Sequence, residues 1–414
     1  TPVAHLTGRW LQVKPGSPVA VTFDQPVSLV AFRHHRARRL ATPRASVPVG
    51  VVARGSHRQG VIAVAAAARS WELVSAVVRV TWFPAQPLTQ LLTEPRPDVA
   101  IAPGRQLRLT FSEPVQDALG SVRPRLKPAT PGRWRMADAH TLIFQPHAPG
   151  FAFGSTLRVV LPKPVLLAGA GTASTTTVRW HVPLGSTLRL QQLLAQLGYL
   201  PLDWVPAQAD LSTARAQLAA AVSAPAGRFF WRYPKTPPEL KAQWQAGRWN
   251  QVTRGAVMMF ESTHGLAADG LVGPKVWREV VADALAGKRR DAGYTYVFVH
   301  RNLPQSLNLW HNGRVILKSP GNTGVPAAPT QLGTYPVFEH IRSGTMSGTN
   351  PDGTRYNDPG IQYISYFHHG DALHAFKRSS FGTPQSLGCV ELPLAAAAKV
   401  WPYTPIGTLV TIEN

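Results

Sequence analysis

The chain has a single cysteine, Cys389, in a segment whose residues could make a thiol reactive. His374 lies fifteen residues before it, and Gly382, Pro384 and Gly388 make the intervening chain a loop that can fold back. A thiol becomes an effective nucleophile when a base or an imidazolium lies nearby. The backbone N–H groups around Gly388 could also hold an oxyanion, and a glycine there lets a substrate approach. The spacing therefore predicts a cysteine nucleophile with a histidine base.

The same residues leave alternatives open. His368 and His369 could supply the base instead, because 20 or 21 residues to the cysteine can also be bridged. These two histidines could equally belong to a surface loop or lid. A zinc site of His368, His369 and His374 has no acidic or helical ligand context, so we expect no metal. For Cys389 itself, the alternative is an inert buried thiol.

The segment resembles the catalytic signature of L,D-transpeptidases of the YkuD type, a histidine followed after a loop by [S/T]-x-G-C-[I/V]. The residues that match in order are Leu373-His374, Phe381-Gly382, Ser386, Gly388-Cys389-Val390 and Leu392. An earlier part of the family pattern is met by Asn312-Gly313, Thr323-Gly324, Pro329-Thr330 and Gly333-Thr-Tyr335. The resemblance covers residues 293–414 and implies that no metal or organic cofactor is needed.

Roles follow from the resemblance position by position. It implies that Cys389 attacks the carbonyl of a donor peptide and that His374 takes the thiol proton. The backbone carbonyl of Ala375 would orient the imidazole. The N–H groups of Gly388 and Cys389 would hold the oxyanion. Ala375 stands where relatives have glycine or serine.

The expected substrate-binding residues include departures from the family pattern. Leu387 stands where many members have a second histidine, so an imidazole there is not essential in this chain. Glu391 replaces a common arginine or asparagine, which changes the charge near the substrate. We expect both to contact substrate, together with Ser386 and three aromatic residues of a lid, Tyr363, Tyr366 and Phe367. Packing in the protein is the alternative for the aromatic residues.

The elements that must position these groups are mostly strands. Residues 294–299, 306–310, 315–318, 333–338 and 407–412 have strand patterns, and Asn312-Gly313 predicts a hairpin turn. We assign residues 291–414 to this β-rich catalytic domain. Residues 288–293 are the expected linker into it.

Residues 184–290 change to a helical period. A leucine stripe from Leu188 ends at Gly198, a second stripe begins at Val257, and a last helix starts at Pro274. The segment resembles the three-helix peptidoglycan-binding domain. The matches are Leu197-Gly198-Tyr199, Ala256-Val257, Phe260-Glu261 where the family has Phe-Gln, Gly265-Leu266, Asp269-Gly270, Gly273-Pro274 and Trp277. An insertion at 203–248 departs from the family. A helical spacer that no longer binds glycan is the alternative.

The first half of the chain is β-rich. Residues 18–23, 47–52 and 77–82 predict strands of an antiparallel β sandwich over residues 1–90, which would act as a spacer. Residues 106–111, 141–145, 155–161 and 176–180 predict a second, immunoglobulin-like sandwich over residues 91–183. The fold class is therefore multi-domain and mainly β, with two sandwiches, a small three-helix domain and the catalytic domain. A chain of 414 residues is too long for one core.

Composition narrows the partners. The 43 Lys and Arg against 21 Asp and Glu give a net charge of +22, typical of proteins that meet polyanions. Basic residues interleaved with stacking aromatics are missing, so we expect no nucleic acid, and the basic run 33–39 is a solvated surface. One cysteine excludes an intrachain disulfide. No apolar run is long enough to span a membrane.

Together these observations predict an extracytoplasmic enzyme of the cell wall or a secreted one. It would form 3→3 cross-links between peptidoglycan stem peptides through a Cys thioester. The alternatives are an L,D-carboxypeptidase or endopeptidase that uses water, and a non-catalytic wall-binding scaffold. Anionic wall polymers would suit the basic surface, with binding that weakens as salt is added. We expect a monomer, and the start at Thr1 suggests that a targeting or anchor segment was removed.

Overall fold

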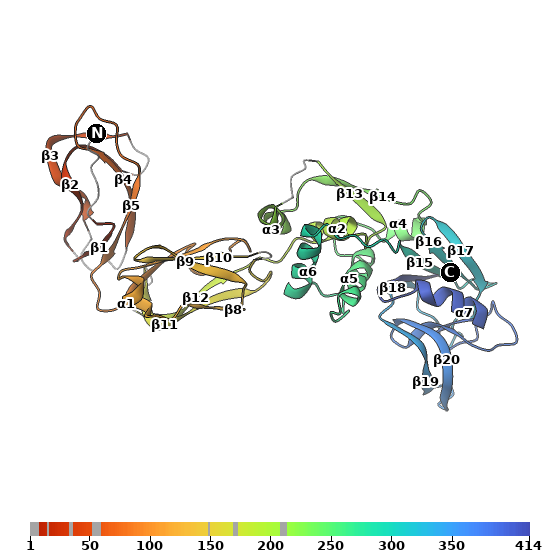
Figure 1. The fold of residues 1–414 in the computed structure, drawn as a ribbon. Coiled ribbons are helices and arrows are strands. Elements are labelled where there is room, and N and C mark those ends of the chain that lie inside the picture. The colour runs from red at the N-terminus through yellow and green to blue at the C-terminus, as the bar shows by residue number, and fades with distance from the viewer. Residues whose placement is uncertain are drawn as a thin grey trace. The chain divides into compact units, whose positions relative to one another are not determined.

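The computed structural model describes residues 8–14, 16–32, 36–51, 59–147, 150–168, 173–207 and 213–414. The chain divides into two compact units, Thr1–Val182 and Pro183–Asn414 (Figure 1). Each unit holds two of the four expected domains, and the boundaries within each unit stay predictions. Thr1, Val52 and residues 33–35 of the basic run lie outside the described residues. No helix in the described ranges is long and apolar enough to cross a membrane.

The first sheet has five strands in the order β1-β5-β4-β2-β3. They are β1 (Trp10–Val13), β2 (Pro18–Phe32), β3 (Arg38–Val51), β4 (Gly60–Ala67) and β5 (Val78–Pro84). The pairing of β2 with β3 shifts register between Thr22 and Val27, so the long strands bend. The bend brings the core residues Val21, Val30 and Val80 together. The five strands thus form one continuous hydrogen-bonded sheet around a shared core, and the expected sandwich arrangement stays a prediction.

The second sheet follows the order β12-β11-β6-β7-β10-β9, with β8 paired to β11. Its elements are β6 (Gln90–Glu94), β7 (Leu107–Phe111), α1 (Val115–Leu119), β8 (Arg125–Lys127), β9 (Gly132–Asp138), β10 (Thr141–Pro146), β11 (Thr156–Leu167) and β12 (Ser174–His181). The pairing of β11 with β12 shifts register between Val160 and Val165, and past this bend β11 pairs with β6. One bent strand thus joins both layers of a sandwich around Trp180. Its immunoglobulin-like identity stays a prediction.

The second unit begins with the helical region. It contains α2 (Thr187–Gln196), α5 (Gln251–Thr263) and α6 (Pro274–Leu285). The expected first helix is confirmed: it starts after the Ser186 cap, whose hydroxyl accepts from the N–H of Arg189, and it ends before Gly198, at φ 83°. The second helix starts at Gln251, before the apolar stripe, because Asn250 caps it. The inserted segment is itself folded into β13 (Leu202–Pro206), α3 (Ala214–Val222), β14 (Gly227–Trp231) and α4 (Pro238–Ala242).

The catalytic region has two sheets, in the orders β17-β16-β15-β23-β18 and β19-β20-β21-β22. The first comprises β15 (Thr295–His300), β16 (Ser306–His311), β17 (Arg314–Pro320), β18 (Gly333–Pro336) and β23 (Leu409–Glu413). The second comprises β19 (Glu339–Thr349), β20 (Arg355–His368), β21 (Asp371–Ala375) and β22 (Val390–Leu392). α7 (Leu394–Val400) and a 3-10 turn (Trp401–Tyr403) follow β22. The expected Asn312-Gly313 hairpin is confirmed, with both residues at positive φ.

One core joins these two sheets. Val297 and Val410 from the first sheet, Leu373 and Val390 from the second, and Val400 from α7 belong to one buried cluster. Burying one face of β21 and β22 in this way leaves the other face free to carry polar groups. The packing of the core therefore determines which residues of these two strands can reach a substrate.

Candidate active site

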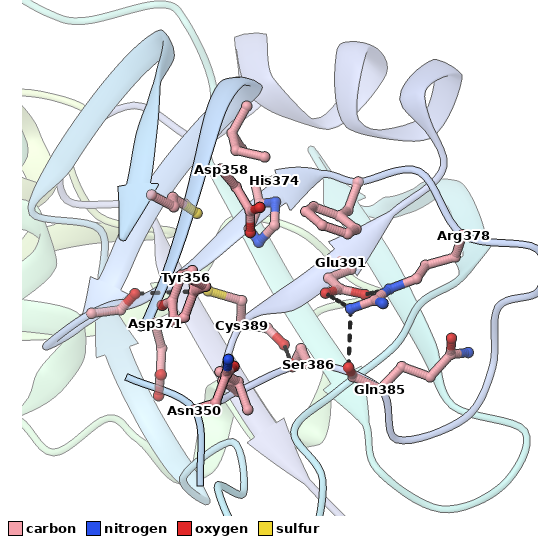
Figure 2. A pocket seen from close by; sticks show the side chains of 15 residues that line it. Asn350, Tyr356, Asp358, Asp371, His374, Arg378, Gln385, Ser386, Cys389 and Glu391 are labelled. Carbon is pink, nitrogen blue, oxygen red and sulfur yellow. Dashed lines mark hydrogen bonds and ion pairs between the residues drawn. The ribbon is translucent and has the colours of Figure 1, made fainter. Parts of the chain in front are cut away.

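A cavity of about 420 Å³ lies over the second sheet of the catalytic region (Figure 2). Residues from β20, β21 and β22 line it, together with the loop between β21 and β22 and the end of the β19–β20 hairpin. Five residues expected from the sequence are part of the lining: His374, Ser386, Leu387, Cys389 and Glu391. Five of the residues expected to act in catalysis or binding therefore lie around one cavity.

Strand register explains why these groups meet. β21 and β22 are parallel, with His374 opposite Glu391. Continuing this register by one residue places Cys389, which directly precedes β22, opposite Ala372. Side chains two residues apart on a strand share a face. Cys389 and Glu391 therefore share a face with His374, while Leu373, Ala375, Val390 and Leu392 belong to the core.

The loop that carries the cysteine is held by the segment that follows β17. The side-chain oxygen of Asn322 accepts from the N–H of Gly382 at 2.9 Å. The backbones of Asn322 and Glu391 exchange hydrogen bonds of 3.0 and 2.9 Å. The carbonyl of Thr323 accepts from the N–H of Ser386 at 3.1 Å. Asn322 and Thr323 are fully buried, so this segment fixes the middle and the C-terminal end of the loop between β21 and β22.

Gly388 has a conformation that other residues rarely adopt. Its φ is 114°, and a Cβ atom there would lie 2.1 Å from Oδ1 of Asp371. Its N–H points to the hydroxyl of Ser386 at 3.3 Å, and that hydroxyl donates to the carbonyl of Cys389. Glycine is therefore required both by the backbone and by the neighbouring carboxylate. The oxyanion role of the Gly388 N–H stays a prediction.

Cys389 is partly exposed, and it packs against a small apolar cluster of Ile361, Ile364 and Ala372. Its Sγ lies 3.7 Å from the carbonyl oxygen of Gly370. Burial raises the pKa of the thiol to about 12, and the charges of Asp371 and Glu391 raise it further, while a hydrogen bond from the N–H of Ala372 lowers it. The group is therefore a neutral thiol at neutral pH and needs a base to react.

His374 is placed to be such a base. It is 3% exposed, and its Nδ1 lies 2.9 Å from the carbonyl oxygen of Ala375. A carbonyl only accepts, so Nδ1 carries the proton and Nε2 keeps its lone pair. Burial lowers the pKa of His374, an effect that the Ala375 hydrogen bond and the charge of Glu391 oppose. The imidazole is therefore neutral at neutral pH and able to accept a proton.

The other two histidines lie at the β20–β21 turn. Nδ1 of His368 is 3.3 Å from Oδ2 of Asp371, and its ring contacts those of Tyr335 and His369. Among the described residues that line the cavity, His374 is the one histidine. Burial raises the pKa of Asp371, and His368 opposes this. Of the three candidates for the base, the geometry therefore favours His374.

Glu391 does not carry its charge alone. Arg378, a residue that the motif did not single out, donates from Nε to Oε2 at 2.8 Å and from Nη2 to Oε1 at 2.7 Å. Nη2 also donates to the carbonyl of Gln385 at 3.0 Å, and the guanidinium lies over the Phe376 ring. The negative charge expected from Glu391 is thus largely balanced by a neighbouring cation.

The expected aromatic lid residues do not line the cavity. Phe367 is 3% exposed in the core between the sheets, and Tyr363 packs near Trp401 and Arg342. Tyr366 stacks on Phe338. Tyr363 and Phe367 thus pack in the protein, whereas Tyr366 belongs to the same apolar cluster as Cys389, and substrate contact by these residues stays a prediction. Tyr363 has a φ of 60°, which interrupts the alternation of faces along β20.

Other residues that sequence reasoning missed take their place. Tyr356 and Asp358 of β20 line the cavity, with Met346 of β19 and Asn350 of the hairpin turn. Figure 2 shows Tyr356 beside Cys389 and Asp358 beside His374. The spacing of Tyr356 and Asp358 by two residues, on one face of a strand, was a signal that could have found them.

Comparison with known proteins agrees with this arrangement. Residues 294–412 match the model of the YkuD family, described as the L,D-transpeptidase catalytic domain. Residues 294–412 are a YkuD-family L,D-transpeptidase domain. This domain includes the whole lining of the cavity. No curated protein sequence matches the chain.

Several solved structures are similar to the chain. An L,D-transpeptidase from Mycobacterium smegmatis is 12% identical, with 79% of this chain and 99% of that chain covered and a TM-score of 0.27. L,D-transpeptidase 3 from Mycobacterium tuberculosis, in complex with a faropenem-derived adduct, is also 12% identical, with 78% and 97% covered and a TM-score of 0.27. The catalytic domain of the E. faecium L,D-transpeptidase is 25% identical, with 30% and 99% covered and a TM-score of 0.27. The assignment of the L,D-transpeptidase domain rests on the family match.

Proposed function

We propose that the chain is a peptidoglycan L,D-transpeptidase that makes 3→3 cross-links through an acyl-enzyme on Cys389. The observation that carries this proposal is the placement of Cys389 and His374 on one face of the β21–β22 pair, inside a cavity of the L,D-transpeptidase domain. An enzyme with these substrates works outside the cytoplasm, at the cell wall. The helical domain would bind glycan, and the basic surface would meet anionic wall polymers.

The first half-reaction forms a thioester. As Sγ attacks the carbonyl carbon of the donor tetrapeptide, its proton passes to Nε2 of His374, and the tetrahedral oxyanion is held by backbone N–H groups of Gly388 and Cys389. The C–N bond then breaks, the imidazolium protonates the leaving amine, and D-Ala departs. Because thiol and imidazole are both neutral beforehand, the proton moves during the attack.

The second half-reaction consumes the thioester. The side-chain amine of a diamino acid on a neighbouring stem attacks the thioester carbonyl and loses a proton to His374. The C–S bond breaks, and the proton returns to the thiolate, which restores the resting enzyme. If water attacked instead, the product would be a trimmed monomer, as in an L,D-carboxypeptidase.

A covalent probe tests the nucleophile and its base. A carbapenem should add its full mass to the native chain, because ring opening by Sγ loses no atoms, and Cys389→Ala should form no adduct. His374→Gln should acylate about 10²- to 10⁴-fold more slowly, because the base is lost while Cys389 remains. Intact-mass spectrometry over time measures both, and an adduct on Cys389→Ala would contradict the assignment of the nucleophile.

Digestion of purified sacculi identifies the reaction. The native enzyme should produce 3→3 cross-linked muropeptide dimers with release of D-Ala, both detected by mass spectrometry. Cys389→Ala is the matched control and should leave the muropeptide profile unchanged. Trimmed monomers without dimers would replace the transpeptidase proposal with a carboxypeptidase.

A further inference from the structure

Arg378 is held in the cavity more firmly than a surface arginine. Its Nε and Nη2 form a two-point contact with Glu391, whose side chain is 5% exposed, and Nη2 also reaches the carbonyl of Gln385. The ring of Phe376 lies 4.6 Å from the guanidinium carbon. These contacts fix the plane of the guanidinium, so little conformational entropy remains to be lost when a ligand binds.

The contacts leave part of the guanidinium unused. An arginine has five N–H donors, and the contacts with Glu391 and Gln385 use three of them. The two donors on Nη1 have no partner among the described residues. The Arg378 side chain is 30% exposed and belongs to the cavity lining. A fixed guanidinium edge with free donors is suited to a carboxylate, which accepts two parallel hydrogen bonds.

The charges around the thiol favour binding of an anionic group at the end of the cavity that holds Arg378. Asp358, Asp371 and Glu391 line the cavity, and Arg378 is the one lysine or arginine among the described lining residues. Figure 2 shows Asp371 on one side of Cys389, and Glu391 with Arg378 on the other. A carboxylate on the substrate would be repelled near Asp371, whereas near Arg378 the charge of Glu391 is balanced and the Nη1 donors can hydrogen-bond to it.

The spacing also fits a particular carboxylate. Cys389 and Glu391 are two residues apart in extended chain, a separation of about 6.6 Å along the strand. In a donor peptide whose last residue is the leaving group, the terminal carboxylate lies one residue beyond the carbonyl that Sγ attacks. Consecutive Cα atoms are about 3.8 Å apart, so such a carboxylate can reach past Cys389 toward the Glu391 side of the cavity.

We propose that Arg378 binds the terminal carboxylate of the leaving D-amino acid and that Glu391 positions the guanidinium for this contact. The donor is then restricted to peptides that end in a free carboxylate one residue beyond the acylated carbonyl. This inference rests on the proposed function and adds a donor-binding residue to it. It also explains why a glutamate is tolerated beside the thiol, since Glu391 holds the cation that recognises substrate.

Two donors that differ only at the terminus test this assignment. One is the tetrapeptide stem with a free C-terminal carboxylate, and the other is the same peptide with a C-terminal amide. The native enzyme should use the acid about 10- to 100-fold better in kcat/KM, measured as release of D-Ala or D-alaninamide. The double variant Arg378→Gln/Glu391→Gln should lose this preference, mainly through a higher KM for the acid, so that its kcat/KM values for the acid and the amide agree within about threefold.

The variants separate recognition from structure. The double change removes both charges, so it leaves no buried ion unpaired, and its rate with the amide reports whether the site is intact. Arg314→Gln, an exposed arginine of β17 outside the cavity, is the matched control and should keep the preference. Arg378→Lys should keep only part of it, because an ammonium lacks the planar fork.

The outcomes that overturn the inference differ from those that overturn the proposed function. Equal kcat/KM of the native enzyme for acid and amide, or an equal loss of kcat/KM on both donors in the double variant, would contradict the role of Arg378. The proposed transpeptidase function would be unaffected. Release of neither product, together with no carbapenem adduct on Cys389, would remove the proposed function itself.

Discussion

The helical domain and the catalytic domain each bury a glutamate where the family patterns have another residue. The two glutamates differ in the partners that compensate their charge. Glu261, in α5, is 1% exposed and accepts one hydrogen bond, of 2.8 Å, from the N–H of Gly270. Glu391, in β22, is 4% exposed and is held by two hydrogen bonds from Arg378. One site therefore has a full countercharge, and the other has only a backbone dipole.

The difference shows what burial costs when no countercharge is provided. Burial raises the pKa of Glu261 to about 7, and the charge of Asp269 adds to this, while the Gly270 hydrogen bond lowers it. The same domain buries Arg189 completely. Its hydrogen-bond partners among the described residues are the carboxamide oxygens of Gln192 and Gln217, and its guanidinium lies over the Trp204 ring. Burial lowers the pKa of Arg189 to about 10. The helical domain thus carries uncompensated charges, whereas the catalytic domain pairs its charge next to the thiol.

Removing the partner of Glu391 should leave this glutamate without a countercharge, like Glu261. Of the changes considered, we expect it to have the largest effect on the free energy of unfolding. Arg378→Ala leaves a buried carboxylate unpaired, and we expect a loss of about 2–4 kcal/mol in the free energy of unfolding at pH 8. The partial exposure of Arg378 keeps the loss below the range for a fully buried pair. An unpaired buried carboxylate loses its electrostatic cost once it is protonated, so the loss should be smaller at acidic pH than at pH 8. Chemical denaturation at pH 8 and pH 5 measures it.

The double variant Arg378→Gln/Glu391→Gln is the matched control. Because no charge is left, it should lose less stability than Arg378→Ala and should show no added dependence on pH. A loss in Arg378→Ala that is the same at pH 8 and pH 5 would contradict the electrostatic explanation and point to lost packing on Phe376 instead.

Removing the charge of Glu261 should make the helical site resemble the family pattern, with a smaller effect. Glu261→Gln restores the family residue and keeps an acceptor for the Gly270 N–H. The folded pKa of about 7 lies above the unfolded value, so the native chain loses stability as pH rises from about 4.5 to 7. The variant should therefore be more stable by about 1–3 kcal/mol at pH 8 and equal near pH 4. Hydrogen exchange of α5 amides localises the gain.

An exposed acid of the same domain provides the comparison for this change. Glu279→Gln, in α6, removes the carboxylate of a side chain that is 38% exposed. It should change the free energy of unfolding little at either pH. A gain for Glu261→Gln that does not grow between pH 5 and pH 8 would mean that the folded carboxylate is ionised at no extra cost.

Local signals predicted the elements that carry the chemistry. The leucine stripe ending at Gly198 and the proline at 274 gave α2 and α6, because caps and periodicity act over a few residues. Bends in β2 and β11 were not predicted, since they depend on register shifts between strands that the sequence does not display.

The candidate site divides in the same way. Cys389 and His374 could be predicted because a motif fixes their spacing, and the parallel register then places them on one face. Arg378 could not be, because its partner Glu391 lies across a loop and only tertiary packing unites them. The aromatic residues Tyr363 and Phe367 were assigned to the cavity by proximity in sequence, but the positive φ of Tyr363 rotates this part of β20.

A third acid, Asp371, is partly buried, with 16% of its side chain exposed, and it provides the test with the smallest expected effect. It contacts His368 at 3.3 Å, and its charge is one cause of the raised pKa of Cys389. Asp371→Asn keeps the shape that faces Gly388 and removes this charge, so the thiol pKa should fall. We expect alkylation of Cys389 by iodoacetamide at pH 9 to become about 2- to 10-fold faster, because the thiolate is the reacting form. Glu339→Gln, an exposed acid at the start of β19 outside the cavity, should leave the rate unchanged. An unchanged rate in Asp371→Asn would contradict this role of the Asp371 charge and would leave burial and the charge of Glu391 as the causes of the raised thiol pKa.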